Sequence, residues 1–531
     1  MPVLTAVATD ESGPYVAPVV IVGAGTAGIS FALEFVKHST APLVMIEPGG
    51  PAVGSDSPAF LDAVRPENLW EGIRVQCVDN GPVVQYPQAR VLGGGSAING
   101  MLAGLPPSDA PMMRAIGWNQ APTGGAESHD EQAGQVGRAL LQLGGYRWVR
   151  NVEDGRRRDG TSALAEMVES GRLTLIRGEV DSVVFDENKV VGVRVDGRIV
   201  DASAVVMCAG AVGTPRVLSR SALPAGVPAQ VGAGLMDHPC ISFVLHLRDA
   251  PPAGIADALV HVGATSLPWA GANIDPARAW RVDTGRPAAA EARTWGSSRA
   301  SGVIMGYERL SRHDAGKGII SAVLLRPFSR GSMDFSDGVL LRPRMLSHPV
   351  DGLAMVGLVR DLIRVAMRPE IAAIATHVTV DDVGTRVTEI AALPDDLLLE
   401  WIRSHLSPVA HAVGTCSGLL GNLSDPFGEE AANLTESQIA LSEVQARLVS
   451  RWREANRQAG IPDAPVSGAV GPVNVPGVTV RGAVGLHIAD SSGLRFIPAD
   501  MINAHVAAHA ARVARVLTGA AGGRRTQGRT A

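Results

Sequence analysis

Residues 18–50 read PVVIVGAGTAGISFALEFVKHSTAPLVMIEPGG, and this stretch decides the fold. It opens with a short apolar run, turns through Gly23, Gly25 and Gly28, and continues with apolar residues at helical spacing. A second apolar run, residues 43–46, then ends in Glu47. A strand, a glycine-rich turn, a helix and a second strand in this order predict a βαβ unit of a parallel sheet.

The three glycines have separate physical roles in such a turn. The first permits a tight turn, the second lets the backbone approach a pyrophosphate, and the third lets the helix pack closely on the strand. The free N–H groups of the helix N-terminus favour an anion, and a carboxylate at the end of the second strand accepts hydrogen bonds from a ribose. Glu47 therefore indicates a dinucleotide without a 2′-phosphate, and leaves FAD and NAD both open.

Composition excludes several classes of function. The 531 residues carry 47 Lys and Arg against 52 Asp and Glu, so no basic field favours nucleic acid. No apolar run approaches the ~20 residues that span a bilayer, and residues 1–17 lack the pattern of a secretory signal, so we expect a cytoplasmic protein without a membrane span. The four cysteines are widely separated, which fits neither a disulfide framework nor a zinc site.

The remaining chain predicts a second domain of mixed character. Residues 173–206 alternate apolar with polar and indicate a strand meander, and further strands are expected at 240–247, 301–307 and 318–327. Helices are expected at 351–367, 395–406 and 435–457, the last with a capping box of Thr435 and Gln438. Residues 55–105 are rich in Gly and Pro and indicate an extended loop, whereas 520–531 read as a disordered tail.

Five blocks of the sequence, in this order, resemble the glucose-methanol-choline (GMC) flavoprotein oxidoreductases. They are the dinucleotide stretch above, RVLGGGSAING at 90–100, AVVMCAGAVGTPRVLSRSAL at 204–223 with GAGLMDHP at 232–239, HAVGTCSG at 411–418, and GLHIADSSGLRFIPADMINAHVAAHAARVARVL at 485–517. The resemblance implies an α/β, overall α+β, architecture: a Rossmann-like FAD-binding domain with a mixed-sheet substrate domain. The low Lys content adds a hint of a bacterial, GC-rich source.

The resemblance also implies residue roles and domain bounds. The FAD would be held noncovalently, because Ile98 occupies the position of the His that attaches flavin in other members. The implied FAD-binding domain spans 18–240 and 470–519 and the substrate domain 241–410, with an insertion at 420–469. The implied cofactor contacts are Gly23, Gly25, Gly28, Glu47, Arg90, Gly93, Gly94, Ser96, Asn99, Gly100, Val180, Ala209, Asp490 and Val506.

Oxidation of an alcohol needs a base for the hydroxyl proton and an acceptor for the hydride. By correspondence with the family, His411 is the candidate base and His505 its partner on the substrate oxygen, while His238 orients a loop beneath the cofactor. His505 and His509 are four residues apart, but HVAAH lacks the glutamate of a zinc-protease helix, so no metal is expected. His411 and His505 are 94 residues apart, wider than the family pattern, and the excess surrounds the helix at 435–457.

The expected reaction is oxidation of a small-molecule alcohol. Two alternatives stay open: a GMC-like flavoprotein with non-oxidative chemistry, of the lyase or photodecarboxylase type, and a flavin-binding scaffold without catalysis. The electron acceptor is also open between oxygen, a quinone and a redox carrier. The region after Gly100 is short compared with the family, so the substrate cannot be inferred through it.

Overall fold

The computed structural model describes residues 17–56, 60–103, 134–143, 146–147, 149–150, 152–153, 156–249, 262–263, 302–308, 316–325, 327–420, 478–495, 497–498 and 501–519. The helix predicted at 435–457 and the tail at 520–531 lie outside these residues. None of the helices in the described ranges is both long and apolar enough to cross a bilayer.

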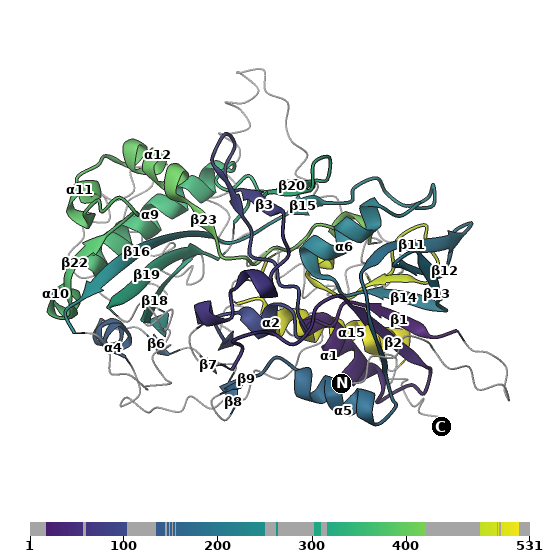
Figure 1. Cartoon of the computed structure of the whole chain (residues 1–531). Helices are drawn as coiled ribbons and strands as arrows, with labels where there is room; N and C mark the ends of the chain where they lie inside the picture. The colour runs from purple at the N-terminus through teal and green to yellow at the C-terminus, as the bar shows by residue number, and fades with distance from the viewer. Residues whose placement is uncertain are drawn as a thin grey trace, which may run out of the picture.

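A five-stranded parallel sheet forms one end of the molecule (Figure 1). Its order is β10 (Thr174–Arg177), β2 (Leu43–Glu47), β1 (Val19–Val22), β14 (Ala204–Met207) and β24 (Leu486–Ile488). Every neighbouring pair is parallel, and β1 and β2 are almost wholly buried, as expected for apolar strands covered on both faces. In the sequence, β10 and β14 are separated by the strands β11 (Val180–Asp186), β12 (Lys189–Val195) and β13 (Arg198–Asp201), which form a separate antiparallel meander.

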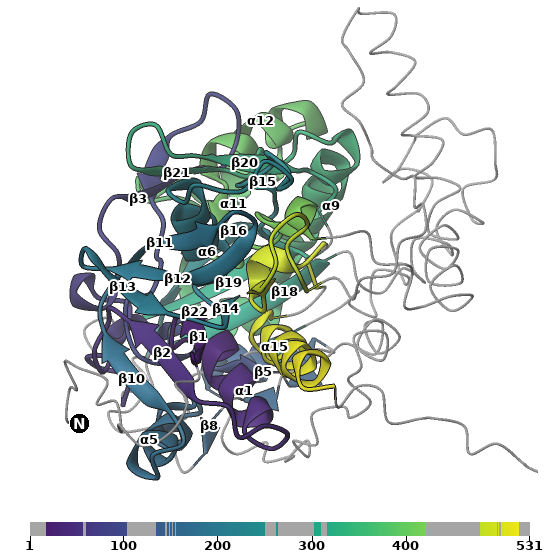
Figure 2. The same ribbon diagram turned by 90° about the vertical axis from the view of Figure 1, so that its right-hand side faces the viewer.

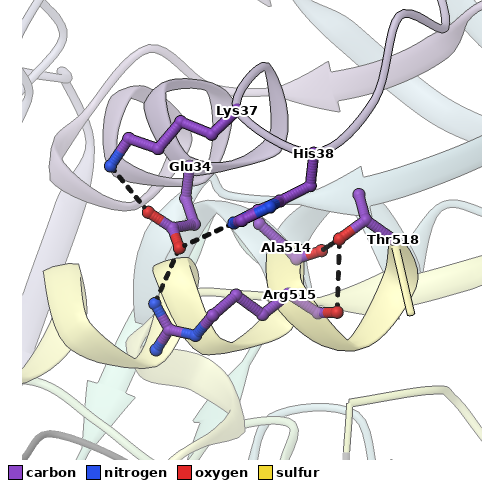
Figure 3. Close-up of polar contacts among 6 residues, drawn as sticks. All are labelled: Glu34, Lys37, His38, Ala514, Arg515 and Thr518. Carbon is purple, nitrogen blue, oxygen red and sulfur yellow. Dashed lines mark hydrogen bonds and ion pairs between the residues drawn. The ribbon is translucent and has the colours of Figure 1, made fainter. Parts of the chain in front are cut away.

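Two helices far apart in the sequence pack together beside the parallel sheet. α1 (Thr26–Phe35) and α15 (Asn503–Leu517) lie side by side, as Figure 2 shows, and share an apolar core. A polar cluster joins their far ends, where Glu34 accepts from Arg515 at 2.9 Å (Figure 3). Although burial opposes ionisation, hydrogen bonds from three basic neighbours lower the pKa of Glu34 to about 2, so the carboxylate stays charged in this contact.

A second, antiparallel sheet forms the other end of the molecule. Its order is β18 (Gly302–Glu308), β19 (Lys317–Leu324), β16 (Pro239–Leu247) and β22 (Ala375–Thr379). Helices α9 (Pro349–Ala366) and α12 (Asp395–His405) cover one face of it (Figure 1). Side chains alternate along each strand, so Phe243 and Ile320 join the core with these helices while their sequence neighbours face the opposite way.

A third sheet shows that the prediction of an extended loop at 55–105 was wrong in part. This segment contains β3 (Ile73–Gln76) and β4 (Val83–Gln85), and β3 pairs in parallel with β21 (Val339–Arg342). β20 (Gly331–Asp334) and β15 (Ala233–Leu235) complete the sheet. The strands predicted at 240–247, 301–307 and 318–327 are present as β16, β18 and β19, and the helices predicted at 351–367 and 395–406 are present as α9 and α12. Their ends differ from the predicted ones by up to three residues.

Candidate functional site

A cavity of about 620 Å³ lies at the carboxyl ends of the parallel strands. Val22, Glu47 and Cys208, at or next to the ends of β1, β2 and β14, line one side of it, and residues of the antiparallel sheet line the other. This edge is where open α/β sheets bind their ligands, because loops and helix N-termini converge there. Its volume is within the ~300–1,000 Å³ range of cofactor and small-molecule sites.

The three glycines of the turn have the geometry that the sequence predicts. Gly23 has a φ of +106°, which a side chain rarely adopts. A Cβ at Gly28 would collide with the carbonyl oxygen of Gly23, so only glycine lets α1 pack on the end of β1. Gly23 and Gly25 line the cavity, whereas Gly28 supports the turn from behind.

Glu47 both lines the cavity and organises the turn. One carboxylate oxygen accepts from the N–H of Ala24 at 2.9 Å, and the other accepts from the N–H of Gly49 at 2.7 Å. Burial raises the pKa of Glu47, and the two backbone donors oppose that shift. The carboxylate therefore has a fixed position at the end of β2.

The loop at 90–100 packs directly against the glycine-rich turn at 23–28, called the dinucleotide turn after the motif that it resembles. A Cβ at Gly94 would lie 2.8 Å from the Cα of Gly25, so both loops approach through glycine backbone. Gly94, Asn99 and Gly100 line the cavity. Gly93 and Ser96 stand behind it, where the Ser96 hydroxyl donates to the Gly93 carbonyl at 2.7 Å.

Trp70, Glu179 and Arg216 line the cavity together with Val180 and Ala209. Arg216 pairs with Glu179 at 2.8 Å and stacks on Trp70, with 4.7 Å from its guanidinium carbon to the ring centroid. Arg90 stacks on the same ring at 4.8 Å, and is not among the cavity-lining residues.

Asp490 joins the C-terminal segment to the start of α6 (Gly210–Ser219). Its carboxylate accepts from the N–H of Gly210 at 2.8 Å, from the Thr214 hydroxyl and from the N–H of Ser492. Burial raises its pKa, against the effect of these donors. Asp490 and Val506 both line the cavity, so the last part of the chain contributes to the same site as the first.

His238 and His411 contact each other, and the contacts of the two rings fix which ring nitrogens carry protons. The Nδ1 atoms of the two rings are 3.0 Å apart. Nε2 of His238 lies 3.1 Å from the Leu325 carbonyl and 3.0 Å from the Pro498 carbonyl. Because carbonyl oxygens only accept, this Nε2 carries the proton, and burial lowers the pKa of His238 far enough to keep the ring neutral.

The tautomer of His411 follows from that of its partner. A neutral His238 with its proton on Nε2 offers a lone pair at Nδ1, so His411 donates its own Nδ1–H to it. Nε2 of His411 then holds a lone pair. Burial lowers the pKa of His411 to about 4, so the imidazole is neutral near pH 7. His411 lines the cavity, and its ring is in the protonation state of a general base.

A buried carboxylate and a tyrosine hold this pair in place. Asp237 Oδ1 accepts from the backbone N–H groups of His238 and His411, at 2.7 and 2.9 Å. The Tyr86 hydroxyl donates to Asp237 Oδ2 at 2.8 Å and accepts from the N–H of Ala412. Sequence reasoning assigned His238 a role in loop orientation but did not predict Tyr86, Asp237 or the contact with His411, because 151 residues separate Tyr86 from Asp237 and 173 separate the two histidines.

His505 is buried on the first turn of α15 and is not among the residues that line the cavity. Its neighbours Asn503 and Val506 do line it, and Asn503 accepts from the Thr26 hydroxyl at 2.7 Å. The proposed role of His505 on a substrate oxygen therefore stays a prediction. The described residues contain no group of three His, Cys, Asp or Glu side chains arranged to hold a metal ion.

Comparisons with known proteins agree with the sequence motifs. Residues 128–240 match the family model of the GMC oxidoreductases. No curated protein matches the chain by sequence. Among solved structures, a pyridoxine 4-oxidase from Mesorbium loti has a TM-score of 0.65 at 18% identity, covering 94% of this chain and 99% of that one.

Two further solved structures are similar over almost their whole length. A formate oxidase from Aspergillus oryzae has a TM-score of 0.67 at 16% identity and covers 97% of this chain and 99% of that one. A fungal aryl-alcohol oxidase has a TM-score of 0.62 at 18% identity and covers 95% and 99%. Identities this low show the fold, and the predicted fold and the resemblance to GMC oxidoreductases are both confirmed.

Proposed function

Starting from this GMC fold and the match at residues 128–240, we propose that the chain is an FAD-dependent oxidoreductase that oxidises an alcohol. The observation that carries the proposal is that one cavity is lined both by the dinucleotide turn and by His411 in its neutral Nδ1–H form. A nucleotide cofactor and a base thus meet in a single site. We also propose that residues 18–240 and 470–519 bind the FAD and that residues 241–410 bind the substrate, since both parts contribute residues to this cavity.

The residues present fit FAD. The backbone of Gly23 and Gly25 faces the cavity without side chains, which leaves room for a pyrophosphate at the start of α1. Glu47 would hold the ribose, Gly94, Asn99 and Gly100 would hold the flavin, and Asp490 and Val506 would hold its ribityl and pyrimidine side, since all of them line the cavity. Ile98 lines the cavity and offers no atom for a covalent bond, so we propose noncovalent binding.

The bound FAD would supply the acceptor for the hydride. The chain supplies the base: Nε2 of His411 takes the hydroxyl proton, and the resulting imidazolium keeps its Nδ1–H bond to His238. The hydrogen bond that the backbone N–H of His411 donates to Asp237 Oδ1 holds His411 in place, so little reorganisation is needed when the proton moves. We propose a cytoplasmic location, and oxygen, a quinone and a redox carrier all remain candidate electron acceptors.

The test is reduction of the flavin by alcohol in the absence of oxygen. The purified protein should be yellow, and its visible flavin absorption should bleach when an alcohol substrate is added. His411→Ala should keep its FAD and lose about 10²- to 10⁴-fold in reduction rate. A flavin that stays oxidised through turnover would instead indicate lyase-type or photodecarboxylase-type chemistry, and a colourless protein that takes up no FAD would overturn the proposal.

A further inference from the structure

One face of the antiparallel sheet forms the wall of the cavity opposite the dinucleotide turn. Because side chains alternate along a strand, every second residue points into the cavity. From β16 these are Cys240 and Ser242, from β18 Met305 and Tyr307, and from β19 Ile319, Ser321 and Val323. We call these seven residues the sheet wall.

The sheet wall carries no charged side chain. The acidic and basic side chains, other than His411, that line the cavity within the described residues are Glu47, Glu179, Arg216, Arg220 and Asp490, and all of them come from the side of the parallel sheet. His411, which stands between the two sides, is neutral near pH 7 because burial lowers its pKa to about 4. A charged substrate at the wall would therefore lose its hydration without gaining an ionic partner.

The polar atoms of the wall are already bonded to one another. The hydroxyls of Ser242 and Ser321 are 2.7 Å apart across paired positions of β16 and β19, and the Cys240 thiol is 3.6 Å from the Ser242 hydroxyl. A polyhydroxylated substrate needs many free donors and acceptors, because each of its buried hydroxyls costs free energy if left unpaired. The wall offers mainly apolar surface from Met305, Ile319 and Val323.

We propose that the site selects uncharged alcohols with an apolar body, an aromatic ring or an alkyl chain, and excludes anions, quaternary ammonium compounds and sugars. The inference rests on the proposed function and adds its substrate class. The apolar body would lie on the sheet wall and the hydroxyl would face His411. Burial of that body supplies binding free energy in proportion to its apolar area.

A set of unreactive ligands with one ring and three charges tests the wall directly. Benzamide is neutral, benzoate is an anion and benzyltrimethylammonium is a cation, and binding of each to the FAD-loaded protein can be followed by the shift of the flavin spectrum or by calorimetry. Benzamide should bind at least about tenfold more tightly than either ion. An ion that binds as tightly as benzamide would overturn the proposal.

A charge placed on the wall should reverse this order. Ile319 is only half-buried, so Ile319→Asp can keep its carboxylate partly hydrated. The variant should bind benzyltrimethylammonium at least about tenfold more tightly than the wild type does, whereas the uncharged control Ile319→Asn should not. If both variants bind all three ligands as the wild type does, the ring does not lie on the sheet wall and the proposal fails.

Measurements of flavin reduction test the proposed substrate class separately from the proposed alcohol oxidation. Benzyl alcohol should reduce the flavin, while choline, formate and glucose should do so at least about 100-fold less efficiently. Equal reduction by choline would overturn the substrate class and leave alcohol oxidation standing. Selective binding of benzamide without reduction by benzyl alcohol would overturn alcohol oxidation and leave the selectivity of the wall standing.

Discussion

Replacing His238 by glutamine should slow proton removal without touching the substrate. The amide of the introduced glutamine can still donate toward the two carbonyls that receive Nε2–H of His238, but it places no acceptor where Nδ1 was. Asparagine at the same position does the reverse, because its side-chain oxygen can occupy the place of Nδ1 and accept from His411. The two variants therefore separate the tautomer of His411 from the packing of its partner.

The expected size follows from one buried hydrogen bond. A buried donor without an acceptor costs about 1–3 kcal/mol, so His411 would move to the tautomer with its proton on Nε2. That form cannot act as a base, and the reduction rate should fall roughly 5- to 150-fold in His238→Gln. His238→Asn should fall less, because the acceptor at Nδ1 is kept.

Two measurements check this reasoning. Anaerobic stopped-flow gives the rate of flavin reduction against pH, and nitrogen NMR of histidine-labelled protein reports which ring nitrogen of His411 carries the proton. Wild type and His238→Asn should show Nδ1–H, and His238→Gln should show Nε2–H. An unchanged tautomer, or equal rates in both variants, would refute the argument that His238 sets the protonation of the base.

Three further outcomes follow from the structure. Gly25→Ala should fold normally, since its Cβ meets nothing closer than the Cα of Gly94, at 3.5 Å, and should bind FAD at least about tenfold more weakly, because this Cβ is added to a residue that lines the cavity. Gly28→Ala should lower the melting temperature sharply or fail to fold, because its Cβ would collide with the Gly23 carbonyl. Equal melting temperatures of the two variants in calorimetry would contradict this. Tyr86→Phe leaves a carboxylate oxygen and a backbone N–H unpaired, and should lower the free energy of unfolding in urea by about 2–4 kcal/mol; a loss below about 0.5 kcal/mol would show that the network is dispensable. Stability should also fall as pH drops from 6.5 to 4, because burial lowers the pKa of three histidines (His411, His487, His509) to about 4 and the unfolded chain binds protons first. Asp237, whose pKa burial raises to about 7, acts in the opposite direction, as do Glu47 and Asp490, whose pKa values burial also raises. A melting temperature that rises over this range would show that these buried acids dominate.

The fold of residues 18–50 could be predicted because the sequence features that determine it lie close together in the chain. Gly28 is required by the carbonyl oxygen of Gly23, five residues before it, and Gly23 by its own positive φ, so these two reasons lie in one short stretch. A Cβ at Gly23 would also meet the carbonyl of Cys208, which only the folded chain brings there. Glu47 is similar, since both its partners belong to the turns beside it. Periodicity likewise found β16, β19 and α9, whose patterns depend on which face of each element is buried.

The contacts that hold His411, made by Tyr86, Asp237 and His238, could not be predicted in this way. Alternation shows that a segment is a strand but not which strand it pairs with, and β3 finds its parallel partner β21 more than 260 residues later. The same topology brings Tyr86 to Asp237 and His238 to His411. The Asp-His-Pro segment was visible as a motif, but the tautomer needs the two carbonyls that only the folded chain brings to His238.

The order of strands in the parallel sheet also governs when the cavity can form during synthesis. β1 is made first and β24 almost last, and Asp490 and α15 follow β24 directly. The cavity can therefore form only after the chain as far as α15 has left the ribosome, and under the proposed function FAD would bind after that point. Nascent chains and products that end before β24 would leave the outer edge of β14 unpaired, and such an exposed strand edge marks them for proteolysis.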